Sequence, residues 1–111
     1  MIVNTTPQDW RVTAAEEARR AVTDLEFVLD DSPDADAPVP TFADVLARMW
    51  RAAQAAEAAA GALVTAEVRA GMSWAEVART LGFATAEEAR RALAPAMAAG
   101  ERRLHDRLPH A

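Results

Sequence analysis

The sequence predicts an all-α protein of four to five helices. Four segments begin with a hydroxyl residue followed three positions later by an acid, a pattern in which a side-chain oxygen caps the first N–H groups of a helix. No stretch alternates apolar and polar residues as a half-buried strand does, and Tyr is absent. The four capping pairs are Thr13/Glu16, Thr41/Asp44, Ser73/Glu76 and Thr85/Glu88.

Length and composition favour one small core. The chain has 111 residues, of which 51% are hydrophobic, enough for one domain and too few for two. It has no Cys, which excludes disulfides and thiolate zinc sites. We find no leader and no apolar run of membrane-spanning length, and therefore expect a cytoplasmic protein that does not enter a membrane.

The net charge of −5 is unevenly distributed along the chain. Residues 1–60 hold 5 Arg and 11 acids, giving −6, whereas residues 61–111 hold 7 Arg and 6 acids, giving +1. The acidic N-terminal half is therefore a candidate surface for a protein partner. The nearly neutral C-terminal half is compatible with DNA binding of modest, salt-sensitive affinity.

Residues 1–29 are expected to form a tail and one amphipathic helix. The helix is predicted from Thr13 to Leu29, and Trp10 in the preceding tail is expected to dock onto the domain or onto a partner. Residues 30–40, "DDSPDADAPVP", combine three Pro with four Asp and break the helical pattern. We interpret them as an acidic linker, either a solvated spacer or a docking motif for a basic partner. The apolar stripe predicted for the first helix comprises Ala14, Ala18, Ala21, Leu25 and Val28.

A helical domain is predicted for residues 41–111, beginning with a long Ala-rich helix from Thr41 to about Ala70. Its apolar residues recur every three or four positions. Because such a helix is roughly 45 Å long, longer than a domain of this size needs, we expect a second copy of the chain to cover part of it. The alternative is a helix bent or broken at Gly61, with all packing within one chain. The predicted homodimer interface comprises Val45, Met49, Trp50, Ala53, Ala56, Ala60 and Leu63.

The segment "RAGMSWAEVARTLGFATAEEARRAL" has the capping and turn residues expected of two short helices joined by a turn. Ser73 caps the first, Gly82 suits a left-handed turn, and Thr85 caps the second. The run from Ser73 to Phe83 resembles the helix-turn-helix units of small bacterial DNA-binding proteins. The resemblance covers about residues 69–93 and implies a unit at 73–93 whose second helix reads DNA.

One departure from that family concerns the second helix. An apolar residue usually lies six positions after the turn Gly, but Glu88 occupies that position and Ala89 follows it. A turn longer by one residue would restore the packing and would shift the side chains that reach a DNA groove.

The hexamer "EEARRA" occurs at residues 16–21 and again at residues 87–92, inside the expected DNA-reading helix. Arg90 and Arg91 suit contact with phosphate or guanine, yet Glu87 and Glu88 lie three to four residues earlier and can pair with them. Both interpretations stay open. Trp74 is expected to pack against the long helix, with stacking on nucleic acid as the alternative. The candidate DNA contacts are Arg69, Ser73, Arg79, Thr85, Arg90 and Arg91.

The last segment is expected to start a fifth helix at Pro95, because Pro suits a first turn and breaks a helix interior. His105 and His110 have poor spacing for a metal site, and nothing suggests a catalytic centre or a cofactor. The sequence thus predicts a homodimeric DNA-binding protein, a transcriptional regulator or accessory factor. The alternative is a non-catalytic protein-interaction module of helix-turn-helix shape that does not bind DNA.

Overall fold

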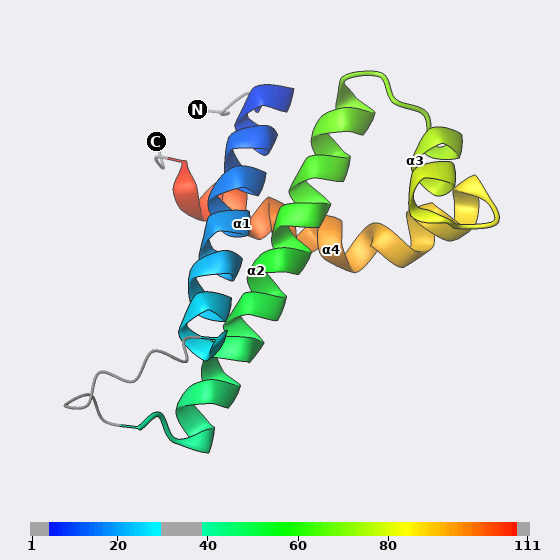
Figure 1. Cartoon of the computed structure of the whole chain (residues 1–111). Helices are drawn as coiled ribbons and strands as arrows, with labels where there is room; N and C mark the ends of the chain where they lie inside the picture. The colour runs from blue at the N-terminus through cyan, green and yellow to red at the C-terminus, as the bar shows by residue number, and fades with distance from the viewer. Residues whose placement is uncertain (1–4, 30–38, 109–111) are drawn as a thin grey trace.

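The computed structural model describes residues 5–29 and 39–108, and within them every regular element is a helix. The helices are α1 (Pro7–Leu29), α2 (Phe42–Arg69), α3 (Trp74–Leu81) and α4 (Ala86–Arg107) (Figure 1). The predicted all-α class is therefore confirmed. Most of the predicted acidic linker, residues 30–38, lies outside the described part of the chain.

Helix α1 begins six residues earlier than the sequence predicted. Its first turn is capped by Thr6 and Asp9, since the Asp9 carboxylate accepts from the Thr6 N–H at 2.9 Å and the Thr6 hydroxyl accepts from the Asp9 N–H at 3.2 Å. Pro7 follows at the first helical position, where its missing N–H costs nothing. The predicted start at Thr13 is wrong, because Thr6/Asp9 has the same spacing and Thr13 is buried in the middle of the helix.

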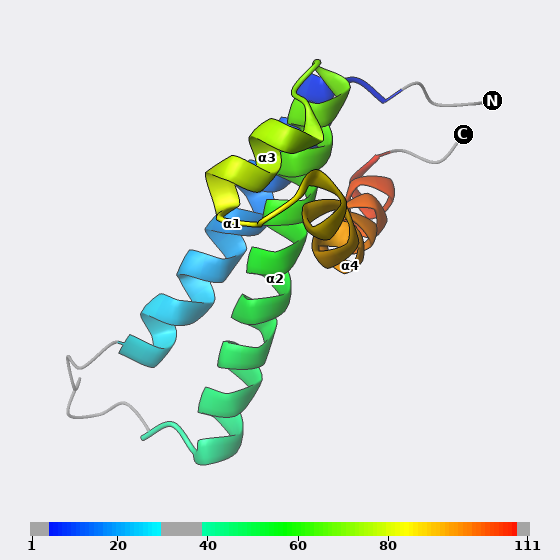
Figure 2. The same cartoon turned by 90° about the vertical axis from the view of Figure 1, so that its right-hand side faces the viewer.

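Helices α1 and α2 lie side by side and run in opposite directions (Figures 1 and 2). The face that α2 buries consists of small residues, including Ala52, Ala55, Ala62 and Ala66. Small side chains let the helix backbones approach closely, so little space is left for large ones. Trp10, which the sequence placed in a tail, is 3% exposed and packs against Ala62 and Ala66 in the core.

Helix α4 crosses α2 at two glycines (Figure 1). A Cβ atom on Gly61 would lie 1.8 Å from the Ala96 carbonyl oxygen, and one on Gly100 would lie 2.6 Å from the Ala62 nitrogen. These glycines are therefore required by backbone contact. Helix α2 continues through Gly61, so the alternative of a break at that residue is wrong.

The predicted fifth helix does not form, because α4 continues through Pro95 to Arg107. Pro in a helix interior costs about 3 kcal/mol. Ala96, Gly100 and Leu104 are buried on one side of α4, and this packing offsets the cost. Arg107 fixes the far end to α1, donating to the Thr13 hydroxyl at 3.0 Å and to the Asp9 carbonyl at 3.1 Å.

The apolar stripes predicted for α1 and α2 do not coincide with the buried faces. On α1, Ala14 and Ala21 are buried as expected, but Ala18 and Leu25 are exposed. On α2, none of the seven residues predicted as a dimer interface is buried within the chain. At 3.6 residues per turn that stripe lies opposite the alanine and glycine face. The packing partners of α2, rather than side-chain size, decide which face is buried.

Candidate nucleic-acid interface

Helices α3 and α4 are joined by a short turn whose geometry follows the sequence signals. The Ser73 hydroxyl accepts from the Glu76 N–H at 3.2 Å, which caps α3. Gly82 ends α3 in the left-handed region, with φ of 82°, a conformation that glycine adopts without a Cβ penalty. The Phe83 N–H then donates to the Ala78 carbonyl at 2.8 Å, closing the turn.

Thr85 caps the start of α4. The Thr85 hydroxyl accepts from the Glu88 N–H at 3.0 Å, and the Glu88 carboxylate accepts from the Ala84 N–H at 3.2 Å. Glu88 therefore lies on the outside of the turn. Ala89 is fully buried in its place, in agreement with the later apolar position found in the sequence.

The two helices pack through small residues. Val77 and Ala78 are the buried residues of α3, and Ala89 is the buried residue in the first part of α4. Helix α3 packs mainly against α4. Figure 2, which faces this end of the molecule, shows α3 and the start of α4 in front of the α1–α2 pair. The start of α4 is thus available to a partner.

The candidate arginines occupy three different environments. Arg79 is exposed on α3. Arg91 pairs with Glu87 at 3.2 Å, but both side chains are more than 80% exposed, so the pair is worth little. The Arg90 guanidinium carbon lies 5.3 Å from the centre of the Trp74 ring, within the range of a cation–π contact. Arg91 therefore forms the intrahelical pair that the sequence allowed, whereas Arg90 stacks on an indole.

The other three candidate contacts have structural roles. The Ser73 and Thr85 hydroxyls accept from the first turns of their helices. Arg69, at the end of α2, donates to the Thr5 hydroxyl at 3.1 Å and lies over the Trp10 ring at 5.1 Å. The structure therefore groups Arg90 and Arg91 on α4 and places Arg69 beside α1.

The helix-turn-helix segment is electrically neutral. Residues 73–93 contain three Arg, at 79, 90 and 91, and three Glu, at 76, 87 and 88. The Glu88 carboxylate accepts from the Ala84 N–H, and Glu87 pairs with Arg91. Long-range attraction to DNA is consequently weak, and binding would depend on local contacts.

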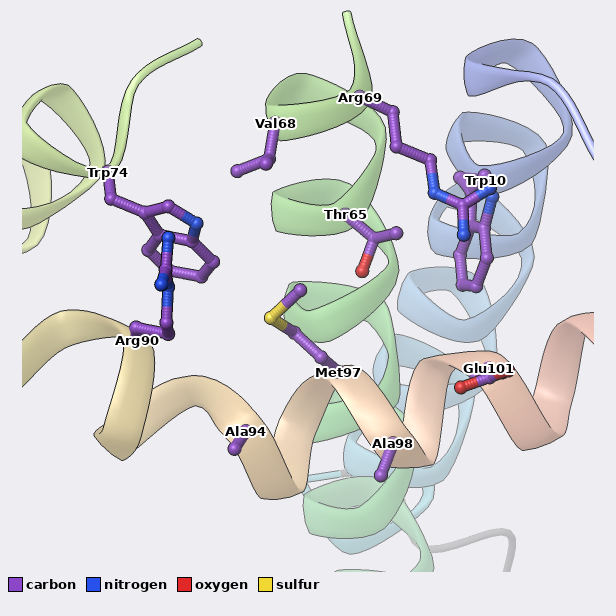
Figure 3. Close-up of a pocket in the computed structure, with 10 residues that line it drawn as sticks. All are labelled: Trp10, Thr65, Val68, Arg69, Trp74, Arg90, Ala94, Met97, Ala98 and Glu101. Carbon is purple, nitrogen blue, oxygen red and sulfur yellow. The ribbon is translucent and has the colours of Figure 1, made fainter. Parts of the chain in front are cut away.

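Sequence reasoning missed a pocket in this region. It lies between α2, α3 and α4, has a volume of about 480 Å³, and includes both Arg69 and Arg90 (Figure 3). Trp10 and Trp74 lie under these two arginines. The residues come from four helices, so no local spacing could reveal the pocket. The sequence signal that could have indicated the pocket was the presence of Trp10 and Trp74 outside the predicted apolar stripes.

Two further observations bear on other functions. Among residues 5–29 and 39–108, no three His, Asp or Glu side chains gather as a metal site requires, and His110 lies outside that part of the chain. None of the described helices has both the length and the apolar composition needed to cross a membrane.

We compared the chain with family models, curated proteins and solved structures, and no match was found.

Proposed function

We propose that this protein is a homodimeric DNA-binding protein of the helix-turn-helix type, acting in transcription as a regulator or accessory factor. One observation carries the proposal: a capped helix, a left-handed glycine turn and a second capped helix form a unit at the end of the molecule. The start of α4 is exposed there and carries Arg90 and Arg91. No catalytic role is proposed.

The proposed docking places the first turns of α4 in the major groove. Recognition helices contact base edges through their N-terminal residues, and Arg91 is exposed for phosphate or guanine once it leaves Glu87. Arg79 on α3 is exposed for a phosphate contact. Glu87 opposes binding, because its carboxylate repels phosphate and competes for Arg91.

The test measures fluorescence anisotropy of labelled genomic fragments at low and moderate salt. Arg90→Ala and Arg91→Ala are expected to weaken binding, and Glu87→Gln to strengthen it. Loss of a phosphate contact reduces the salt slope by about one, and loss of a base contact costs about 1–3 kcal/mol and relaxes sequence preference.

The matched control for these variants is Arg19→Ala in the first "EEARRA" copy. Arg19 is exposed and forms no ion pair in the described chain. Arg20 is unsuitable, because it pairs with the buried Glu17. Equal losses in the Arg19 and Arg91 variants would show that bulk charge alone controls binding, against the proposal.

The proposed homodimer uses the outward face of α2. Trp50 is 65% exposed and Met49 48% exposed, although both belong to the apolar stripe. Between the large residues lie Ala53, Ala56 and Ala60, which would allow a second α2 to approach closely. The occupant is therefore proposed to be a second copy of the chain, packed helix to helix.

Sedimentation velocity tests the dimer. Met49→Glu with Trp50→Glu should give a folded monomer, because neither side chain contributes to the core of one chain. Leu81→Glu is the control, since Leu81 is an equally exposed apolar residue on α3. A wild-type chain that sediments as a monomer at micromolar concentration would exclude this interface.

The alternative proposal is a protein-interaction module that keeps the helix-turn-helix shape. The neutrality of residues 73–93 and the position of Glu87 and Glu88 in the first turn of α4 favour it. If the wild-type protein binds no DNA at low salt, this function replaces the first. The acidic residues of the N-terminal half would then face a basic partner.

A further inference from the structure

The pocket between α2, α3 and α4 has two positively charged walls. Arg69 and Arg90 lie on opposite sides of it, each with its guanidinium over an indole, Trp10 and Trp74 respectively (Figure 3). The stacking restricts both side chains, so less conformational entropy remains to be lost when a ligand binds. The pocket therefore presents two pre-positioned cations.

Neither of these arginines has an anionic partner in the described chain. Six other arginines form ion pairs, among them Arg11 with Glu67 and Arg91 with Glu87. Arg69 donates only to a neutral hydroxyl, that of Thr5. A guanidinium prefers a carboxylate or phosphate partner and binds it in a forked geometry. The pocket thus offers donors for an anion.

The space between the two arginines is apolar. Val68 of α2 and Met97 of α4 project into it, and Ala94 and Ala98 line the α4 side (Figure 3). The volume of about 480 Å³ is in the usual range for small-molecule sites. Glu101 at one end contributes one negative charge, so the three charged side chains sum to +1. This balance suits a monoanion with an apolar body rather than a polyphosphate.

We propose that this pocket binds a small amphipathic carboxylate. The carboxylate would be held by Arg90, and the apolar body would lie on Val68 and Met97, toward Arg69 on the opposite side of the pocket. If the proposed DNA-binding function holds, the ligand also has a regulatory effect, because it holds Arg90 in the pocket and away from DNA. That second step rests on the proposed function, whereas the binding site does not.

Octanoate is the probe, and intrinsic fluorescence is the readout. In a Trp50→Phe background only Trp10 and Trp74 emit, and both line the pocket, whereas Trp50 lies outside it. Octan-1-ol supplies the same chain without the charge, and acetate supplies the charge without the chain. We expect a saturable change with octanoate, with a Kd of the order of 1 mM for a ligand of this size, and at least tenfold weaker binding of both controls.

Substitutions of Arg69 and Arg90 test how much each positive charge contributes to octanoate binding. Arg90→Gln should weaken octanoate binding about tenfold, Arg69→Gln on the opposite side should weaken it less, and Arg79→Gln, outside the pocket, should leave it unchanged. Circular dichroism checks each fold, and if Arg69→Gln loses helix, the exposed Arg90 decides the result. Equal binding of octanol, unchanged binding in Arg90→Gln, or an equal loss in Arg79→Gln would overturn the proposal.

A DNA titration separates the two proposals. With wild-type protein that binds DNA, saturating octanoate should lower the affinity, and Arg90→Gln should abolish this effect. If wild-type protein binds octanoate but no DNA, the pocket stands and the DNA-binding function fails. Octanoate bound with no effect on DNA affinity would contradict only the regulatory step.

Discussion

The two copies of "EEARRA" have the same sequence and opposite structural roles. In α1, residues 16–21 bury Glu17, which is 4% exposed, and the final Ala21. In α4, residues 87–92 bury only the central Ala89, and both glutamates are exposed. The first copy holds the helices together, and the second presents charges at the start of a helix. An identical hexamer therefore has no fixed function.

The ion pairs show the same difference. Glu17 lies 3.2 Å from Arg20 and 3.9 Å from Arg103 of α4, and Glu16 lies 3.6 Å from Arg107. Tertiary contacts thus turn the first copy into part of the α1–α4 contact. Glu17 is buried at this contact, although it lies outside the apolar stripe predicted for α1.

The largest expected effect is the loss of stability when one buried alanine of a copy is replaced by leucine, compared with the same change at the equivalent exposed alanine of the other copy. Ala89→Leu should destabilise the fold by about 1–3 kcal/mol, because Ala89 is fully buried at the α3–α4 contact. Ala18→Leu, at the equivalent position of the first copy, should change stability little, because Ala18 is exposed. Urea unfolding followed by circular dichroism, at one fixed protein concentration, measures both.

The last alanine of each copy provides the reversed control. Ala21→Leu should destabilise the protein and Ala92→Leu should not, since Ala21 is buried and Ala92 is exposed. Similar losses at all four positions would contradict the assignment of different faces to the two copies.

A smaller effect is expected for the second glutamate of each copy. Glu17→Gln should lower the free energy of unfolding by about 1–2 kcal/mol, because the buried side chain loses its charge beside Arg20 and Arg103. The partial exposure of both arginines keeps this value small. Glu88→Gln should cost only a few tenths of a kcal/mol, because the Gln side-chain oxygen can also accept from the Ala84 N–H. Thermal unfolding of the two variants compares them, and a larger loss for Glu88→Gln would reverse the comparison.

The smallest effect concerns acid pH and the start of α1. Hydrogen bonds from the Thr6 backbone and hydroxyl lower the pKa of Asp9 below its usual 3.8. A lowered folded-state pKa gives stability that is present above pH 3.8 and is lost as the pH falls through the folded value. In Asp9→Asn the melting temperature should therefore depend less on pH below about 4 than in the wild type.

Asp44 is the matched control for that measurement. Bonds from the Thr41 backbone and hydroxyl lower its pKa in the same way at the start of α2. Since Asp44 has its own capping box, its contribution should persist in Asp9→Asn, and part of the acid dependence should remain. An Asp9→Asn profile identical to that of the wild type would show that the Asp9 cap does not contribute.

Helix starts were the most predictable part of this protein. Thr41, Ser73 and Thr85 cap helices as the sequence indicated, because an N-cap hydrogen bond involves only four consecutive residues. The same signal misled at Thr13, since Thr6 with Asp9 satisfies it earlier. Local chemistry allowed both starts, and the longer helix buries Trp10.

Which side of each helix is buried was decided by tertiary structure. The sequence correctly predicted a long α2 with a continuous apolar stripe, but within one chain α2 buries the opposite face. The reason is backbone contact: Gly61 and Gly100 let α2 and α4 touch at a crossing that larger stripe residues would prevent. The same packing keeps α4 intact through Pro95.

By itself the sequence determined the all-α class, the acidic N-terminal half and the capping and turn residues between α3 and α4, because these depend on composition and on signals a few residues long. The tertiary structure decided the burial of Trp10 and Glu17 and the pairing of Arg69 and Arg90 with two indoles. Trp74 and Arg90 are 16 positions apart in the sequence, and Trp10 and Arg69 are 59 apart. These contacts arise only when four helices meet, so no local pattern encodes them.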